Sequence, residues 1–413
     1  MTFKYSQIQN ELFNIPLSEN EIRIRVKMGN YLQKPIVTKE SEEGSGPGFK
    51  YGLSAMQGWK SSMQDKFIFE PSLGHLKTFS LFLVLDGFRG DRFPIQVSRE
   101  FSEFLAKHDL FMNLKDGDEY DPDQIADALK QSLINFDEIM RHVPEIDRSG
   151  CTVSGVLITP RHFFIVNLGD SRTILCREKK IYFETEDHEP CIYGERMRIE
   201  AAGGFVSKSR VNGKMKVSRA LGNFPMKSND RKRKLCQLIS PEADVEIIDR
   251  NPADDFIAIA TDGVFQSFSS EDLVQYLVSR IPYKKQLNEL AGDVLDYSCH
   301  SKTKDNLTLI VIHFDDSVIK QQEDKISHDQ ALDDKIRKLT NDYVEEAFAD
   351  GKSAMGWNPC FEKLNERHKE LFSDESNTQS YGIALKKGVI FNEFDKLTTA
   401  IVRARRLKPY KSD

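Results

Sequence analysis

Four aspartates each stand at one end of an apolar run that has the length of a buried β-strand. They are Asp86 after residues 81–85, Asp170 after residues 163–168, Asp262 after residues 256–260, and Asp305 before residues 307–314. A fold that stacked these strand ends would gather the carboxylate oxygens that hard divalent cations bind. The recurrence therefore favours a metal site, although Asp86-Gly87 on its own is more typical of a hairpin turn.

Nine short motifs follow one another in an order that resembles the protein phosphatase 2C family of metal-dependent protein serine/threonine phosphatases. They are YGLSAMQGW at 51–59, DG at 86–87, SGCT at 149–152, GDSR at 169–172, DHEP at 187–190, AGG at 202–204, VSRALG at 217–222, TDG at 261–263 and DN at 305–306. Each motif alone is weak, but nine in one order leave little room for chance. The similarity runs from about residue 28 to residue 314 and covers a whole domain.

The resemblance implies an α+β fold, a four-layer α-β-β-α sandwich with the metal site at one edge between the two sheets. The residues themselves predict strands separated by turns, with helices over 94–106 and 125–140 where apolar side chains recur at helical spacing. Strands mixed with paired helices suit a layered architecture of this kind.

Three segments are expected along the 413 residues. Residues 1–27 form an N-terminal extension, in which the alternation at 22–26 suggests an added strand; residues 28–316 form the phosphatase-like domain. Residues 317–413 form a helical C-terminal extension, with apolar residues at helical spacing over 332–347, 361–372 and 394–404. Residues 44–48, rich in Gly, Ser and Pro, predict a linker or turn.

Bulk properties exclude several classes of protein. A net charge of −6 argues against a general or specific nucleic-acid binder. The six cysteines have no C-x-x-C spacing, so neither a zinc site nor a disulfide framework is predicted. No apolar run approaches membrane-spanning length, and the N-terminal residues are polar. A soluble protein, cytoplasmic or otherwise intracellular, is expected.

Position by position, the resemblance implies a set of metal ligands for Mg²⁺ or Mn²⁺. Asp86 matches the bridging carboxylate, with Asp262 and Asp305 as its companions. Asp170 matches the aspartate that helps to hold an additional, weaker metal, and Gly87 offers its carbonyl oxygen. Two bridged divalent cations would neutralise the phosphate and supply a nucleophile at neutral pH.

Four positions depart from the family pattern. Gln64-Asp65 stands where the family has Glu-Asp, so Gln64 exchanges a charged metal ligand for a neutral amide, and Asp65 is a further candidate metal ligand. Phe88 replaces the histidine at the general-acid position and has no proton to give. Lys60 replaces the arginine that grips the phosphate, and an ammonium lacks the planar fork. Gln266 replaces a second aspartate that helps to hold the additional metal.

Two hypotheses follow. In the first, the protein is a pseudophosphatase or a very weak phosphatase with a degenerate site and fewer bound ions than the family's usual two or three, acting as a binding, scaffold or regulatory protein. In the second, it is an active Mg²⁺- or Mn²⁺-dependent phosphatase that hydrolyses phosphoserine and phosphothreonine. The trio Lys60, Gln64 and Phe88 favours the first hypothesis. The sequence leaves the oligomeric state open.

Basic residues suggest where a protein partner, either a phosphoprotein or a scaffold complex, could bind. Arg210 and Arg219 lie in the segment that the family uses as a flap, and could face a phosphopeptide. The runs at 231–234 and 403–411 are strongly basic and could meet an acidic surface, or they could be a solvated loop and a solvated tail.

Overall fold

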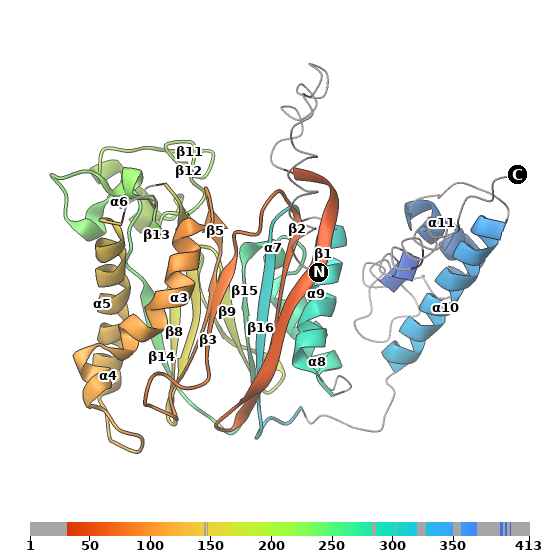
Figure 1. Ribbon diagram of the computed structural model, residues 1–413, viewed down its shortest axis with the longest axis horizontal. Coiled ribbons are helices and arrows are strands. Elements are labelled where there is room, and N and C mark those ends of the chain that lie inside the picture. The colour runs from red at the N-terminus through yellow and green to blue at the C-terminus, as the bar shows by residue number, and fades with distance from the viewer. Residues whose placement is uncertain are drawn as a thin grey trace, which may run out of the picture.

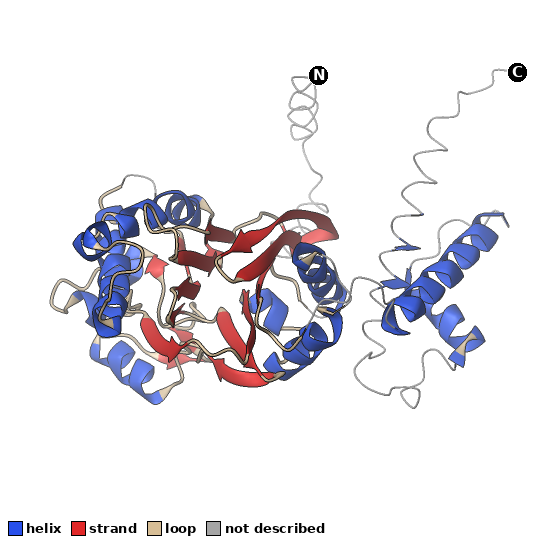
Figure 2. Cartoon of the chain, turned by 90° about the horizontal axis from the view of Figure 1, so that it is seen from below, coloured by secondary structure: helices blue, strands red, loops and turns tan. Residues whose placement is uncertain are grey.

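Two antiparallel β-sheets lie face to face between two layers of helices (Figure 1; Figure 2). This computed structural model describes residues 31–319 except 144, 145, 147, 283–285 and 302, together with 328–349, 357–369, 389, 390, 393, 394 and 397. The arrangement confirms the predicted α+β fold and its four-layer α-β-β-α sandwich.

The first sheet has six strands, and four of them lead to the site. Their order is β1 (Tyr31–Gly46), β2 (Phe49–Lys60), β16 (Leu307–Phe314), β15 (Asp254–Ala260), β9 (Arg172–Arg177) and β10 (Lys180–Glu184). Every residue of β15 and β16 is buried, as expected for strands covered on both faces. Of the predicted linker or turn at 44–48, residues 47 and 48 form the turn between β1 and β2, whereas residues 44–46 are the paired end of β1.

The second sheet has five strands, in the order β14 (Asp244–Asp249), β8 (His162–Leu168), β7 (Val153–Ile158), β4 (Ser80–Leu85) and β3 (Lys66–Glu70). Apolar side chains from both sheets, including Phe82, Phe163, Ile257 and Ile310, form the core between them. A three-stranded sheet of β13 (Leu221–Gly222), β6 (Gly150–Cys151) and β5 (Gly87–Phe88) and a two-stranded ribbon of β11 (Val206–Ser207) and β12 (Arg210–Val211) lie at the site end.

Helices cover the outer face of each sheet with their apolar sides. The five-stranded sheet is covered by α3 (Arg92–Ala106), α4 (Asp109–Asn113) and α5 (Pro122–Met140), and the six-stranded sheet by α8 (Ser270–Arg280) and α9 (Leu287–Ser301). The predicted helices over 94–106 and 125–140 are confirmed as α3 and α5. The sequence sets the start of α5, because Asp121 caps it by accepting a hydrogen bond from the Asp123 N–H, and Pro122 opens its first turn.

Two further helices follow the sandwich, α10 (His328–Ala349) and α11 (Trp357–Arg367). They pack on each other through a small apolar cluster that includes Ile336, Val344 and Leu364. They account for two of the three predicted C-terminal helices; of the third, only residues 394 and 397 are described, both helical, and the basic tail at 403–411 and residues 1–27 lie outside the described residues. No helix among those described is long and apolar enough to cross a lipid bilayer. The segment boundaries at 27, 28, 316 and 317 stay predictions.

Candidate functional site

The four strand-end aspartates meet at one edge of the sandwich. Asp86 follows β4, Asp170 follows β8, Asp262 opens the short helix α7 (Asp262–Phe265) after β15, and Asp305 precedes β16. All four line one pocket of about 260 Å³, together with Lys60 at the end of β2. The antiparallel order of the strands produces this meeting, because it places the ends of β4 and β8 at the same edge of their sheet.

Three of these aspartates form a tight carboxylate group. One oxygen each from Asp86, Asp170 and Asp262 lies within 4.8 Å of the other two. Burial, followed by repulsion from Asp262, raises the pKa values of Asp86 and Asp170 well above the usual range. The buried Oδ1 of Asp262 has no hydrogen-bond partner among the described residues. Clustered, partly unpartnered carboxylate oxygens of this kind fit a hard divalent cation such as Mg²⁺ or Mn²⁺.

Asp305 is not a member of that group, and its carboxylate forms an ion pair with the ammonium of Lys60. Burial alone would lower the pKa of Lys60, but the attraction of Asp86 and Asp305 outweighs it and raises that pKa. Lys60 therefore stays charged next to the carboxylates. In the structure Asp170 lies with Asp86 and Asp262, and the predicted role of Asp305 as their companion in binding metal stays a prediction.

Asp65 lies behind the pocket and does not line it. It is 1% exposed, and its Oδ2 accepts hydrogen bonds from the hydroxyls of Thr261 at 3.0 Å and Thr308 at 2.9 Å. Burial and repulsion from Asp305 raise the pKa of Asp65 to about 7. Its other oxygen has no partner among the described residues. Asp65 thus adds a buried, titratable carboxyl group behind the three-carboxylate group.

Gln64 holds the loop after β4 instead of facing the pocket. In the amide orientation that satisfies both neighbours, its side-chain NH₂ donates to the Gly87 carbonyl at 3.2 Å, and its oxygen accepts from the Gly90 N–H at 3.0 Å. The Gly87 oxygen, which the sequence assigns as a metal ligand, therefore accepts a hydrogen bond from an amide. A glutamate could not donate that bond.

Phe88 has a packing role at the general-acid position. Its ring lines the pocket and contacts an apolar cluster that includes Val217 and Ala220. A side chain at Gly150 would place its Cβ only 2.8 Å from the Cζ of Phe88, so the glycine makes room for the ring. Phe88 brings no titratable group to the pocket.

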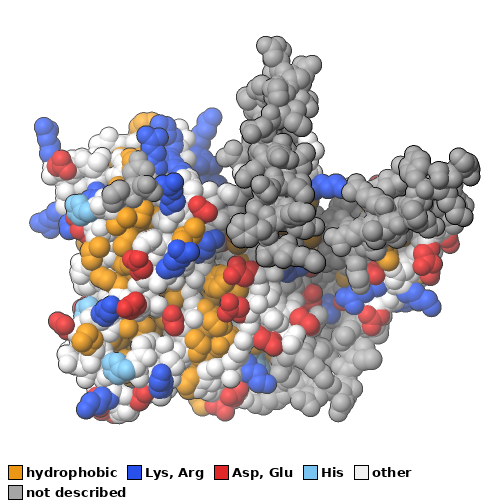
Figure 3. Space-filling model, viewed as in Figure 1, with side chains coloured by type: hydrophobic (Ala, Val, Ile, Leu, Met, Phe, Trp, Pro, Cys, Tyr) orange, Lys and Arg blue, Asp and Glu red, His pale blue; other side chains and the backbone are white. Residues whose placement is uncertain are grey.

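Basic side chains line the pocket together with the aspartates. Most come from the segment between α6 (Tyr193–Ala201) and the short 3-10 helix η2 (Lys234–Cys236), residues 193–236, which we call the flap. Figure 3 shows Lys and Arg side chains gathered over β11 and β12. The pocket lining holds five basic side chains, Lys60, Arg89, Arg210, Lys214 and Lys216, and four acidic ones.

Lys216 of the flap reaches the carboxylate group directly. Its Nζ lies 3.5 Å from Oδ2 of Asp262, and that carboxylate raises the pKa of Lys216. Arg210 lines the pocket as predicted, but Arg219 does not, because it pairs with Glu195 and Asp244. No pattern in the sequence points to Lys216 or Arg89, since a basic residue in a loop is ordinarily solvated.

A neighbouring pocket of about 390 Å³ shares Asp170, Lys216 and Asp262 with the first. Gln266 lines it and accepts a hydrogen bond from the Thr303 hydroxyl at 3.3 Å. This second space extends the site along the flap.

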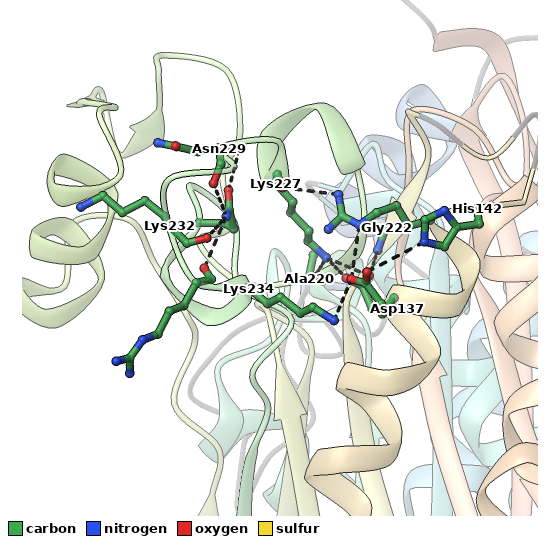
Figure 4. A network of polar contacts seen from close by, with 12 residues as sticks. Asp137, His142, Ala220, Gly222, Lys227, Asn229, Lys232 and Lys234 are labelled. Carbon is green, nitrogen blue, oxygen red and sulfur yellow. Dashed lines mark hydrogen bonds and ion pairs between the residues drawn. The ribbon is translucent and has the colours of Figure 1, made fainter.

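A buried ion pair fastens the flap to helix α5 (Figure 4). Lys227 donates to both carboxylate oxygens of Asp137 at 2.8 Å and to the Ala220 carbonyl at 2.8 Å. The N–H of Gly222 donates to the same carboxylate at 2.6 Å. The Lys227 and Asp137 side chains are 1% and 3% exposed. No sequence pattern predicts this pair, which holds residues 220–227 of the flap against α5.

Comparisons with known proteins agree with the fold and the site. A family model of protein phosphatase 2C matches residues 49–307. The chain is 34% identical to protein phosphatase 1B of Mus musculus over 332 residues, covering 78% of this chain and 85% of the relative. It is 36% identical to protein phosphatase 1A of Bos taurus over 328 residues, covering 77% and 84%.

Solved structures show the same fold. A crystal structure of a phosphatase from Toxoplasma gondii aligns with a TM-score of 0.56 at 21% identity, covering 68% of this chain and 96% of that one. The nine motifs, the four-layer sandwich and the family match over most of the domain agree with one another. The chain belongs to the protein phosphatase 2C family.

Proposed function

We propose that the protein binds phosphorylated serine or threonine residues of a partner protein in this pocket and hydrolyses them very slowly or not at all. The observation that carries the proposal is the pairing of the Lys60 ammonium with Asp305 beside Asp86. The Lys60 ammonium repels a divalent cation bound to the neighbouring carboxylates. Because it is paired with Asp305, it is also not free to bind a phosphate. On this reading the protein is a regulatory or scaffold member of its family.

The composition of the pocket supports binding more strongly than turnover. Five basic side chains against four acidic ones suit an anion such as a phosphomonoester. Hydrolysis also needs a proton for the leaving serine or threonine oxygen, and no histidine lines this pocket among the described residues. The absence of a positioned acid costs about 10²- to 10⁴-fold in rate.

Metal binding is part of the proposal, with fewer ions than the family's usual two or three. Asp86, Asp170 and Asp262 would hold Mg²⁺ or Mn²⁺, and the unpartnered Oδ1 of Asp262 supports this. Such an ion, when bound, withdraws charge from phosphoryl oxygens and lowers the pKa of bound water. A second ion would have to share the carbonyl oxygen of Gly87 with the Gln64 amide that donates to it.

A second candidate function is that of an active Mg²⁺- or Mn²⁺-dependent protein serine/threonine phosphatase. The three-carboxylate group favours it. The two functions are separated by measuring turnover of a phosphothreonine peptide with and without Mn²⁺, alongside binding of the same peptide. Binding without measurable turnover supports the proposed function, whereas robust Mn²⁺-dependent turnover supports the second candidate.

We further propose that protein partners bind through the C-terminal helices and the basic tail. The α10–α11 pair has its own apolar cluster, separate from the three clusters of the sandwich. A basic tail would speed encounter with an acidic partner and lose this effect at high salt.

A further inference from the structure

The loop 87–90 after β4 presents Arg89 to the pocket in an unusual backbone conformation. Arg89 lines the pocket and has a φ of 59°. L-residues other than Gly, Asn and Asp adopt this left-handed region rarely, because Cβ approaches the backbone too closely. Strained residues of this kind persist where the surrounding structure determines them, and they cluster at binding sites.

Here the surroundings determine the loop at three points. Gln64 binds the Gly87 carbonyl at 3.2 Å and the Gly90 N–H at 3.0 Å, one residue on either side of the Phe88-Arg89 pair. The Phe88 ring packs over Gly150 and against the apolar cluster of the flap. Gln64 and Phe88 are two of the departures from the family pattern. Together they hold Arg89, which lies between Phe88 and Gly90, in place.

The Arg89 side chain makes one weak hydrogen bond, which leaves its other N–H donors available to a ligand. Its Nη1 lies 3.4 Å from Oδ1 of Asn223, a long hydrogen bond. Asn223 is fully buried, its N–H donates to the Ser149 carbonyl at 2.8 Å, and its Nδ2 has no partner among the described residues. A guanidinium has five N–H donors, so one long bond orients it without occupying its fork.

Three of the other cations of the pocket already have partners, among them Arg210, whose guanidinium donates to the Lys214 carbonyl at 3.1 Å. Lys60 is paired with Asp305, and Lys216 lies on Asp262. Both carry a compact ammonium, whereas a guanidinium matches phosphoryl oxygens with two parallel bonds.

We propose that Arg89 binds the phosphoryl group of the bound phosphoserine or phosphothreonine residue. It would replace the phosphate-gripping arginine of the family, at whose position this chain has Lys60. This inference rests on the proposed function and names the residue that recognises the phosphate. It also explains why an arginine occupies a left-handed position that glycine would occupy without strain.

The test uses the full chain and titrates it calorimetrically with inorganic phosphate and with a phosphothreonine peptide. Arg89→Gln removes the guanidinium and is expected to weaken both by about 10-fold or more, because charge-assisted hydrogen bonds are lost. Arg89→Lys keeps the charge without the fork and should recover only part of the affinity. Arg231→Gln, in the exposed basic loop, is the matched control and should leave affinity unchanged.

Arg89→Gly separates binding from folding. It relieves the left-handed strain, so the melting temperature should rise by about 2 °C or more while phosphate affinity falls. A purely structural role for Arg89 would make the glycine variant less stable. The inference would be overturned if the wild type binds phosphate, Arg89→Gln and Arg89→Gly leave the affinity unchanged, and Lys216→Gln weakens it. The proposed function would still stand in that case. No phosphate binding by the wild type would overturn both.

Discussion

The ammonium of Lys60 lies against the carboxylate of Asp305, inside a pocket that three other aspartates line. The pair places a fixed positive charge beside the carboxylates that fit a divalent cation. At the effective dielectric of a protein surface, an ammonium several ångströms from a divalent ion disfavours it by about a few kcal/mol.

Removing that charge should strengthen metal binding. We expect Lys60→Met to raise the Mn²⁺ affinity by about 10-fold or more, measured by isothermal titration calorimetry, because the competing cation is gone. Lys39→Met is the matched control, since Lys39 also pairs with an aspartate, Asp296, which does not line the pocket. Equal Mn²⁺ affinities for wild type and Lys60→Met would show that the ammonium does not oppose the ion.

Turnover should return only when several positions are restored together. The unmodified protein is expected to hydrolyse phosphopeptides far more slowly than ordinary family members. The triple variant Lys60→Arg, Gln64→Glu, Phe88→His should recover more rate than the best single variant, because a clamp, a ligand and an acid act on the same transition state. The measurement is phosphate release from a phosphothreonine peptide at fixed Mn²⁺, and high activity in the wild type would refute the prediction.

Stability of the metal-free protein should rise as the pH falls from about 7.5 to 5.5. The pKa of Asp65 is raised to about 7, and those of Asp86, Asp170 and Asp305 are also raised, first by burial. The folded chain therefore binds more protons than the unfolded chain between about pH 4 and pH 7. This stabilisation is complete below the unfolded pKa and is lost as the pH rises through the folded pKa.

Thermal unfolding in a chelator at several pH values measures this effect. Asp65→Asn keeps a side-chain oxygen for Thr261 and Thr308 but removes one titrating group, so its stability should depend less on pH. Saturating Mn²⁺ should also flatten the dependence, because bound carboxylates stay ionised. A metal-free melting temperature that climbs from pH 5.5 to pH 7.5 would contradict the assignment.

The C-terminal extension should be separable from the sandwich. Deletion of residues 320–413 removes α10 and α11, whose apolar residues form their own cluster. It also removes Asp333, which lies 3.9 Å from Arg280 of α8, while the Arg280 guanidinium keeps its position over the Tyr276 ring. We expect a folded body with unchanged phosphate affinity and a lowered melting temperature.

Partner capture by the full chain and the truncated chain tests the proposed role of the extension. Purified partner that binds the full chain should not bind the truncated one. Asp333→Asn is the control for loss of the Arg280 contact alone and should keep every partner. Aggregation of the truncated chain would place the helices in the core of the domain, and retention of all partners would place the binding surface elsewhere.

The local pattern of apolar residues was enough to predict strands and helices, because these depend on residues that are close in sequence. The apolar run before Asp86 and that after Asp305 are the buried strands β4 and β16, and the helical spacing over 94–106 and 125–140 gave α3 and α5. Periodicity reports which face of an element is buried, so it also indicates which residues stand at its end.

Contacts between distant residues could not be predicted in this way. Lys227 lies 90 residues from Asp137, and Lys216 lies 46 residues from Asp262, so neither pairing leaves a periodic signal. The left-handed backbone of Arg89 depends on Gln64, which the sequence suggested only as a weakened metal ligand. The same limit explains why Asp305, grouped with the metal ligands in the sequence, is paired with Lys60 in the structure.

The ion pair between Lys227 and Asp137 has a consequence for how the molecule opens. Breaking a buried pair leaves an uncompensated charge, at a cost of about 3–5 kcal/mol, so the flap cannot detach from α5 cheaply. Amide protons of Gly222 and of the last turns of α5 should therefore exchange with solvent together, as one cooperative unit. Movements of the flap would then involve its outer, basic side, while residues 220–227 stay fastened to α5 until the domain itself unfolds.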